Sequence, residues 1–162
     1  MTENTENKSE EQLLTLQVNS QYIKDLSFES PGMPQSLLSL KQAPDIKISV
    51  DVKALKADEQ DHYTVDLELK IQAEKTDDKK TLFLCELVYG GLVTLKAPQS
   101  HVEPLLLIEI PHLLFPYARA IVSNLIRDAG FPPLQINPID FAALYRARLE
   151  EQRKNKQTQE NK

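Results

Sequence analysis

The sequence predicts an α+β fold in which a four-stranded antiparallel sheet precedes two helices. Apolar residues alternate with polar ones in four stretches before about residue 96, which is the period of a half-buried strand. After that point, apolar residues recur at the three- and four-residue spacing of an amphipathic helix. A run of strands followed by a run of helices is typical of the α+β class, and 162 residues suit a single domain.

The first strand is expected from Leu14 to Phe28, because apolar residues alternate with polar ones from Leu14 onward. The turn-forming segment SPGMP at residues 30–34 ends it. Residues 35–45 then form a long connection with an apolar middle. Long connections that lie over the body of a domain often carry function.

The next two strands, residues 46–52 and 63–71, each have one apolar and one polar face, which predicts an antiparallel meander. The fourth strand, residues 81–95, differs because both of its faces are mainly apolar. A sheet that helices cover on one side needs a second apolar side only if another chain covers it, so this strand predicts an oligomer. Gly90 and Gly91 predict a bulge or a close approach of the backbone to its neighbours. One face carries Phe83, Cys85, Leu87 and Tyr89, and the other carries Leu82, Leu84, Glu86 and Val88.

Two helices joined by a proline-rich segment are expected in the second half of the chain. The first begins near Pro116, which suits an initial helical turn, and ends at Gly130. Residues 131–136 contain too many prolines for a helix. The dipeptide Asn-Pro at 137–138 then caps and starts the second helix, whose apolar face extends over residues 141–149.

Both ends of the chain are expected to lie outside the folded domain, which spans residues 13–149. Residues 1–12 carry four acidic residues and one basic residue, and are expected to be a disordered acidic N-terminus. Residues 150–162 have few apolar side chains and are expected to be a flexible basic tail. An acidic N-terminus without an apolar segment is unlike a signal peptide, and a lone cysteine suits a reducing compartment, so a cytoplasmic protein is expected.

Charge and motif content exclude several classes of function. A net charge of -5 disfavours nucleic acid as a partner. The apolar stretch 105–126 contains charged residues and two prolines, so we expect a core or interface element and no membrane insertion. The three histidines and Cys85 share no metal-ligand spacing, and no phosphate-binding loop or nucleophile elbow is present. We therefore expect an inert Cys85 thiol, no enzymatic activity, no metal and no cofactor.

Apolar side chains also gather in the irregular segments, where a monomer has little need of them. Together they would line a groove for an extended peptide, although each residue taken singly also fits ordinary core packing. The groove candidates are Phe28, Leu37, Leu38, Phe131, Leu134 and Ile136.

Three motifs identify a family resemblance. They are YIKDLSFESP at residues 22–31, FLCE at 83–86 just before the paired glycines, and LFPYAR at 114–119 followed by GFPPL at 130–134. In this order and spacing they resemble the SecB family of bacterial protein-export chaperones, over about residues 14–149.

The resemblance implies two helices packed on one face of the sheet, and assembly as a dimer of dimers, that is, a homotetramer. It also implies ATP-independent holding of unfolded secretory precursors and their delivery to the SecA motor. The family's client groove uses the long connection and the interhelix segment. The resemblance assigns SecA binding to Asp25, Glu29, Leu84 and Glu86, and support of tetramer assembly to Cys85, Leu87 and Tyr89.

Two other functions remain open at this point. A SecB-like chaperone that serves another pathway, such as a toxin–antitoxin system, would fail to bind SecA. A small-ligand-binding α+β domain would be a compact monomer with a closed pocket and no affinity for unfolded chains.

Overall fold

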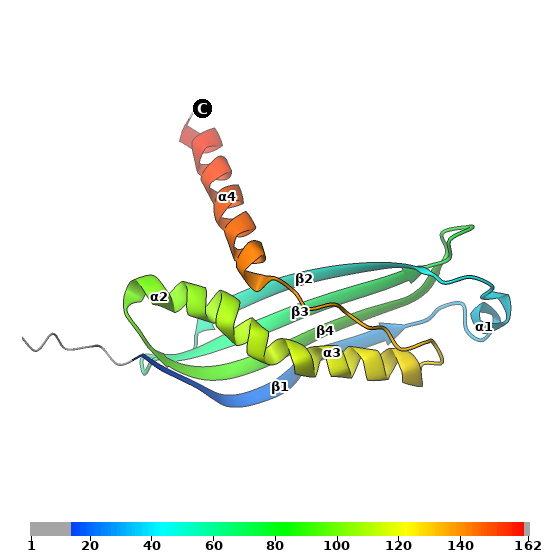
Figure 1. Ribbon diagram of the computed structural model, residues 1–162, viewed down its shortest axis with the longest axis horizontal. Coiled ribbons are helices and arrows are strands. Elements are labelled where there is room, and N and C mark those ends of the chain that lie inside the picture. The colour runs from blue at the N-terminus through cyan, green and yellow to red at the C-terminus, as the bar shows by residue number, and fades with distance from the viewer. Residues whose placement is uncertain (1–13, 161–162) are drawn as a thin grey trace, which may run out of the picture.

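A computed structural model describes residues 14–160, so the segment 1–12, predicted to be disordered, lies outside the described residues. Within residues 14–160, the strands form one antiparallel sheet, as the apolar alternation predicts. The strands β2, β3 and β4 form the expected meander, and β1 pairs with β4, so β1 and β2 are the edges (Figure 1). The strands are β1 (Thr15–Glu29), β2 (Asp45–Lys56), β3 (His62–Glu74) and β4 (Thr81–Lys96).

The long connection between β1 and β2 contains a short helix, α1 (Gln35–Ser39), at one end of the sheet (Figure 1). Met33 and Leu40 on either side of α1 pack against the core, whereas the Leu38 side chain points outward and is 86% exposed. The connection is therefore held to the body at its two ends and leaves apolar surface between them.

A continuous helical rod covers one face of the sheet (Figure 1). It consists of α2 (Gln99–Pro104), the π-helical turn η1 (Leu105–Glu109) and α3 (Ile110–Asp128). The N–H of Ile110 donates to the carbonyl of Leu105, five residues earlier. This wide turn lies next to Pro111, which has no N–H for a regular helical bond. The predicted helix start at Pro116 is wrong, because packing of apolar side chains on the sheet outweighs the proline signal.

The rod packs closely on β4 because of Gly91. A Cβ atom at this position would lie 3.2 Å from Cδ2 of Leu114, which is closer than most such contacts. On the opposite side of the strand, a Cβ atom at Gly90 would lie 2.5 Å from the ring of Tyr22. The paired glycines thus mark the close approach that the sequence predicts. The buried inward residues of α3 include Leu114, Ala118, Val122 and Ile126.

The hydrophobic core lies between the rod and the sheet. Phe83, Leu67 and Leu69 of the sheet are almost completely buried, as are Ile110 and Leu114 of the rod. Among the described residues, the stretch 99–128 is also the one helix that is long and apolar enough to cross a membrane. Its inward side instead packs on the sheet.

The last helix, α4 (Phe141–Glu160), differs from the expected one at both ends. It starts after Asp140, whose carboxylate accepts a hydrogen bond of 2.8 Å from the N–H of Ala143, so Asp140 is the cap in place of the predicted Asn137. It continues past Leu149 through residues whose side chains are exposed at least to position 158. The first turns of α4 lie against η1 and β2, whereas the rest leaves the body (Figure 1). Only the rod therefore forms the expected helical layer, and the flexibility of residues 150–162 stays a prediction.

We predict that Gly91→Val lowers the free energy of unfolding by about 1–3 kcal/mol, because its side chain would collide with Leu114 in a well-packed core. Urea unfolding at fixed protein concentration measures this. Leu92→Val, on the partly exposed opposite face, is the control and should cost clearly less. Equal losses for the two variants would contradict the close packing of the rod on Gly91.

Candidate functional site

The side of the sheet opposite the rod, here called the open face, carries the residues assigned to SecA binding. In the pairing of β1 with β4, Glu29 lies opposite Leu84 and Ser27 lies opposite Glu86. Because paired residues point to the same side, and alternate residues do so too, Asp25, Glu29, Leu84 and Glu86 share this face. Asp25 and Glu29 are exposed, and the other two are half-buried. The structure thus brings the four residues together on one surface.

Lysines neutralise much of the negative charge on the open face. At the centre of this face is a shallow hollow of about 310 Å³. The charged residues that line it include Asp25, Glu68, Lys70 and Glu86. The hydrogen bond to Glu68, followed by the charge of that carboxylate, raises the pKa of Lys53, so this lysine stays charged at neutral pH. The ion pairs are Lys70–Glu86 at 2.8 Å, Lys53–Glu68 at 2.6 Å and Lys24–Asp66 at 2.5 Å.

Asp66 is the most deeply buried charged residue of the open face. Its side chain is 11% exposed, and one carboxylate oxygen has no hydrogen-bond partner among the described residues. The other oxygen accepts from Lys24, whose pKa is raised by this hydrogen bond and by the charge of Asp66. The pair ties β1 to β3 across β4, next to the register shift between Ile23 and Asp25.

The residues assigned to tetramer assembly lie on the opposite face, beneath α3. Cys85, Leu87 and Tyr89 are 0%, 1% and 8% exposed, so they belong to the core of the single chain. Burial, and then the nearby charge of Glu86, raises the pKa of the Cys85 thiol to about 11, which keeps it protonated and unreactive at neutral pH. The ring of Tyr89 stacks at 6.4 Å on Tyr117, a half-exposed residue of α3. The three assigned residues lie next to two elements with exposed apolar residues, namely α3 and the edge strand β1, whose Ile23 and Leu26 pair with Tyr89 and Leu87.

The groove candidates separate into core and surface residues. Phe28 stacks on Phe83 at 5.5 Å between ring centroids, and Phe83 lies 4.9 Å from Phe131. This aromatic row, which we call the aromatic end, ties β1 to the start of the interhelix segment. Leu37 lies near the residue that precedes Phe131, because a Cβ atom built on Gly130 would be 3.7 Å from Leu37 Cδ1.

Exposure differs widely among the other groove candidates. Leu37 and Leu38 are 45% and 86% exposed, whereas Phe131 and Ile136 are buried at 4% and 6%. Leu134 is half-buried against the core. The aromatic end is therefore mostly buried, and the exposed apolar surface near it comes from Leu37 and Leu38. Sequence patterns did not indicate a groove role for Phe83, because its stacking on Phe28 depends on the register of β1 and β4, which pairs Phe28 with Cys85.

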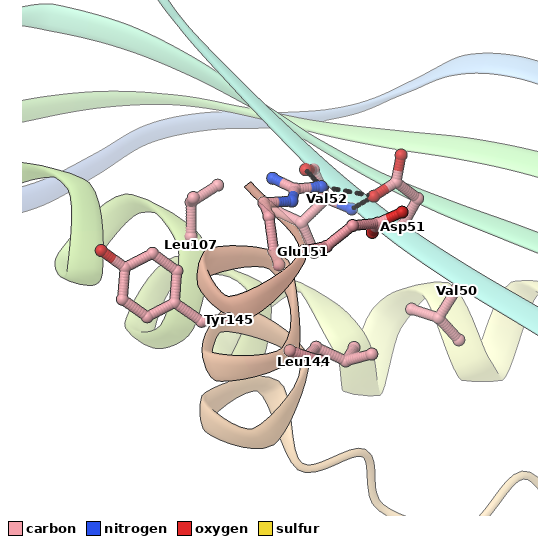
Figure 2. Close-up of a pocket in the computed structure, with 9 residues that line it drawn as sticks. Val50, Asp51, Val52, Leu107, Leu144, Tyr145 and Glu151 are labelled. Atoms are coloured by element: carbon pink, nitrogen blue, oxygen red, sulfur yellow. Dashed lines mark hydrogen bonds and ion pairs between the residues drawn. The ribbon is translucent and has the colours of Figure 1, made fainter. Parts of the chain in front are cut away.

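A second hollow, of about 300 Å³, lies between α4, η1 and β2 (Figure 2). At its rim, the Arg148 guanidinium donates to Asp51 Oδ1 at 2.6 Å and to the backbone carbonyl of Val52 at 2.9 Å. Asp51 Oδ1 also accepts the N–H of Val52 at 2.9 Å. This contact attaches α4 to the edge strand β2. Sequence patterns did not indicate it, because it depends on the angle at which α4 leaves the body. The apolar lining consists of Val50, Val52, Leu107, Leu144 and Tyr145.

Several known proteins are similar to this chain in sequence. The model of the family described as preprotein translocase subunit SecB matches residues 8–152. The protein-export protein SecB of Paramagnetospirillum magneticum is 51% identical over 142 residues, which cover 87% of this chain and 90% of that protein. The protein-export protein SecB of Bartonella quintana is 49% identical over 143 residues, covering 88% and 89%.

A solved structure resembles the fold at much lower sequence identity. It is a SecB-like chaperone of Mycobacterium tuberculosis in complex with a peptide from an antitoxin. The TM-score is 0.59 at 13% identity, and the match covers 76% of this chain and 90% of that chain. This likeness concerns the fold alone.

Proposed function

The chain belongs to the SecB family, and we propose that it is an ATP-independent chaperone that holds precursor proteins unfolded and delivers them to the SecA motor of the Sec translocon. The similarity to protein-export proteins over most of the chain carries this proposal. It is supported by exposed leucines beside a buried aromatic row, which lie apart from the charged residues of the open face. The chaperone domain would span residues 13–149 and act in the cytoplasm, without nucleic acid and without inserting into the membrane.

Client binding is assigned to the aromatic end and the apolar surface that continues from it. A slow-folding precursor exposes apolar segments, and exposed leucines such as Leu37 and Leu38 bury part of them before they meet one another. The half-buried Phe28 and Leu134 extend this surface along β1 and the interhelix segment. Each contact contributes little, so affinity arises from several subsites acting on one long chain.

Docking on SecA is assigned to Asp25, Glu29, Leu84 and Glu86 of the open face. A partner that binds these residues must offer basic groups to the carboxylates and an apolar contact to Leu84. Because the client surface is mainly apolar and the docking surface is mainly charged, salt should weaken docking more than it weakens client holding.

Assembly is assigned to a dimer of dimers formed by copies of this chain. Leu113 and Tyr117 of α3 are 48% and 54% exposed, and Ile23 and Leu26 of the edge strand β1 are 49% and 38% exposed. Apolar surface of this kind is typical of contacts between subunits. Cys85, Leu87 and Tyr89 would support assembly by fixing α3 from beneath, since Tyr89 stacks on Tyr117.

One alternative is a chaperone of the same fold that serves an antitoxin. The likeness to the mycobacterial SecB-like chaperone raises it, but that protein shares only 13% of its sequence with this chain. The relatives at about half identity are export proteins, which favours export.

The central test is whether the purified chain keeps a denatured secretory precursor soluble without nucleotide. The precursor is diluted from denaturant into buffer with the chain, and light scattering after chromatography measures the mass and content of the complex. We expect a tetramer that retains the precursor. A monomer, or a precursor that aggregates or folds as fast as it does alone, would contradict the proposal.

We predict that Glu86→Lys weakens SecA binding by at least about tenfold, because a basic partner would meet a like charge, while precursor holding survives. Titration with SecA and the dilution assay measure the two properties. Glu59→Lys, an equal change of charge at an exposed loop position, is the control and should leave both unchanged. Loss of docking and holding together would show that the surfaces are not separate.

We predict that Tyr117→Lys shifts the native mass from a tetramer to a smaller species while the circular dichroism spectrum stays that of the folded chain. The cause is a charge placed in the apolar contact proposed for α3. Gln152→Lys, on the exposed part of α4, makes the same change of charge and should remain tetrameric. A tetramer of Tyr117→Lys would refute the role of α3 in assembly.

A further inference from the structure

Lys70 lies directly opposite Glu86 on the neighbouring strand of the open face. Its Nζ is 2.8 Å from Glu86 Oε1, and the two side chains are 53% and 43% exposed. An ion pair this exposed contributes little to stability and exchanges easily with outside charges. A basic group of a binding partner can therefore reach Glu86, but it must first take the place of Lys70.

The other cations near this pair are engaged with different carboxylates. Of the three carboxylates assigned to docking, Glu86 has an ion pair, whereas Asp25 and Glu29 have none within residues 14–160. Lys70 is thus the one cation, in this part of the chain, that masks a docking carboxylate. The remaining pairs around it are Lys53 with Glu68, Lys24 with Asp66 and Arg148 with Asp51.

We propose that Lys70 competes with the basic surface of the docking partner for Glu86, and thereby sets the strength of docking. This inference rests on the proposed function, because it assumes that the open face is the docking surface. Two effects act in the same direction. The lysine occupies the carboxylate that the partner needs, and once displaced its ammonium repels the partner's cations within a Debye length.

The shape of the open face strengthens this competition. The hollow of about 310 Å³ is lined by Asp25, Asp51, Glu68 and Glu86, with Lys70 beside them. Glu68 and Asp51 already pair with Lys53 and Arg148. A basic side chain that enters this hollow would therefore meet chiefly Asp25 and Glu86, with the Lys70 ammonium bound to Glu86. Removal of that ammonium therefore makes the hollow a better site for a cation, without removing any apolar contact of the core.

We expect Lys70→Gln to bind SecA about two- to fivefold more tightly at about 50 mM salt, which is the range expected for one exposed ion pair. The gain should disappear at about 300 mM salt, where exposed charges are largely screened. Isothermal titration of the full chain with SecA measures both. Lys79→Gln is the matched control, since Lys79 makes an equally exposed pair with Asp45 at the strand end, away from the hollow. Its affinity should stay close to that of the unmodified chain.

The double variant Lys70→Gln with Glu86→Gln distinguishes competition from a general change of net charge. The gain should become clearly smaller when Glu86→Gln is the background, because the competition for this carboxylate is then absent and only the repulsion between the ammonium and the partner remains. An unchanged or weaker affinity of Lys70→Gln, a gain of the same size without Glu86, or an equal gain for Lys79→Gln would overturn the proposal.

Failure of the proposed function gives a different result. If the unmodified chain does not bind SecA, the docking assignment fails, and the same variants are titrated with a synthetic lysine-rich peptide. A tighter binding of this peptide by Lys70→Gln that depends on Glu86 would still support competition. No difference between the variants would refute it.

Discussion

The close packing of the rod on β4 determines which surfaces of this molecule remain available to partners. Gly91 lets Leu114 approach the strand, and the inward residues of α3 then bury the centre of one sheet face. Because one helical rod is narrower than four strands, the edge strand β1 keeps exposed apolar residues such as Ile23. The rod lies on one side of the sheet and does not cover the opposite face (Figure 1). An apolar edge on β1 and a charged face on the other side of the sheet thus follow from a single helical layer.

The alternation of side chains in β4 gives neighbouring residues different roles. Leu84 and Glu86 point to the open face, whereas Cys85 and Leu87 point into the core. Between positions 84 and 88, a substitution at an even-numbered position changes the open face, and one at an odd-numbered position changes the core. Cys85 is completely buried within the single chain, so under the proposed function its effect on assembly does not require its side chain to touch another subunit. One side of this strand packs in the core, and the other side carries residues of the open face.

The sheet was predictable from the sequence, because period-two alternation reports directly which strand faces are buried. The grouping of the four residues assigned to docking was predictable only in part. Alternation places Leu84 with Glu86, but the register that adds Asp25 and Glu29 depends on bulges in β1. Helix ends were less predictable, because a proline marks a boundary only where no tertiary packing compensates. Pro116 therefore lies within α3. The contact of Arg148 with β2 has no local signal, since it depends on the direction of α4.

Under the proposed function, the charge pattern of the open face favours a docking contact that forms and breaks readily. A face whose carboxylates were all free would bind a basic partner tightly and release it slowly, because affinity differences appear mainly in the dissociation rate. Lysines of the same chain reduce the attraction between these carboxylates and the partner. Replacing an exposed intramolecular ion pair by a contact with the partner costs little free energy. The apolar groove does not depend on these charges, so a client stays bound while the partner exchanges. A carrier that must deliver its client and then leave needs both properties, and the two faces of one sheet supply them separately.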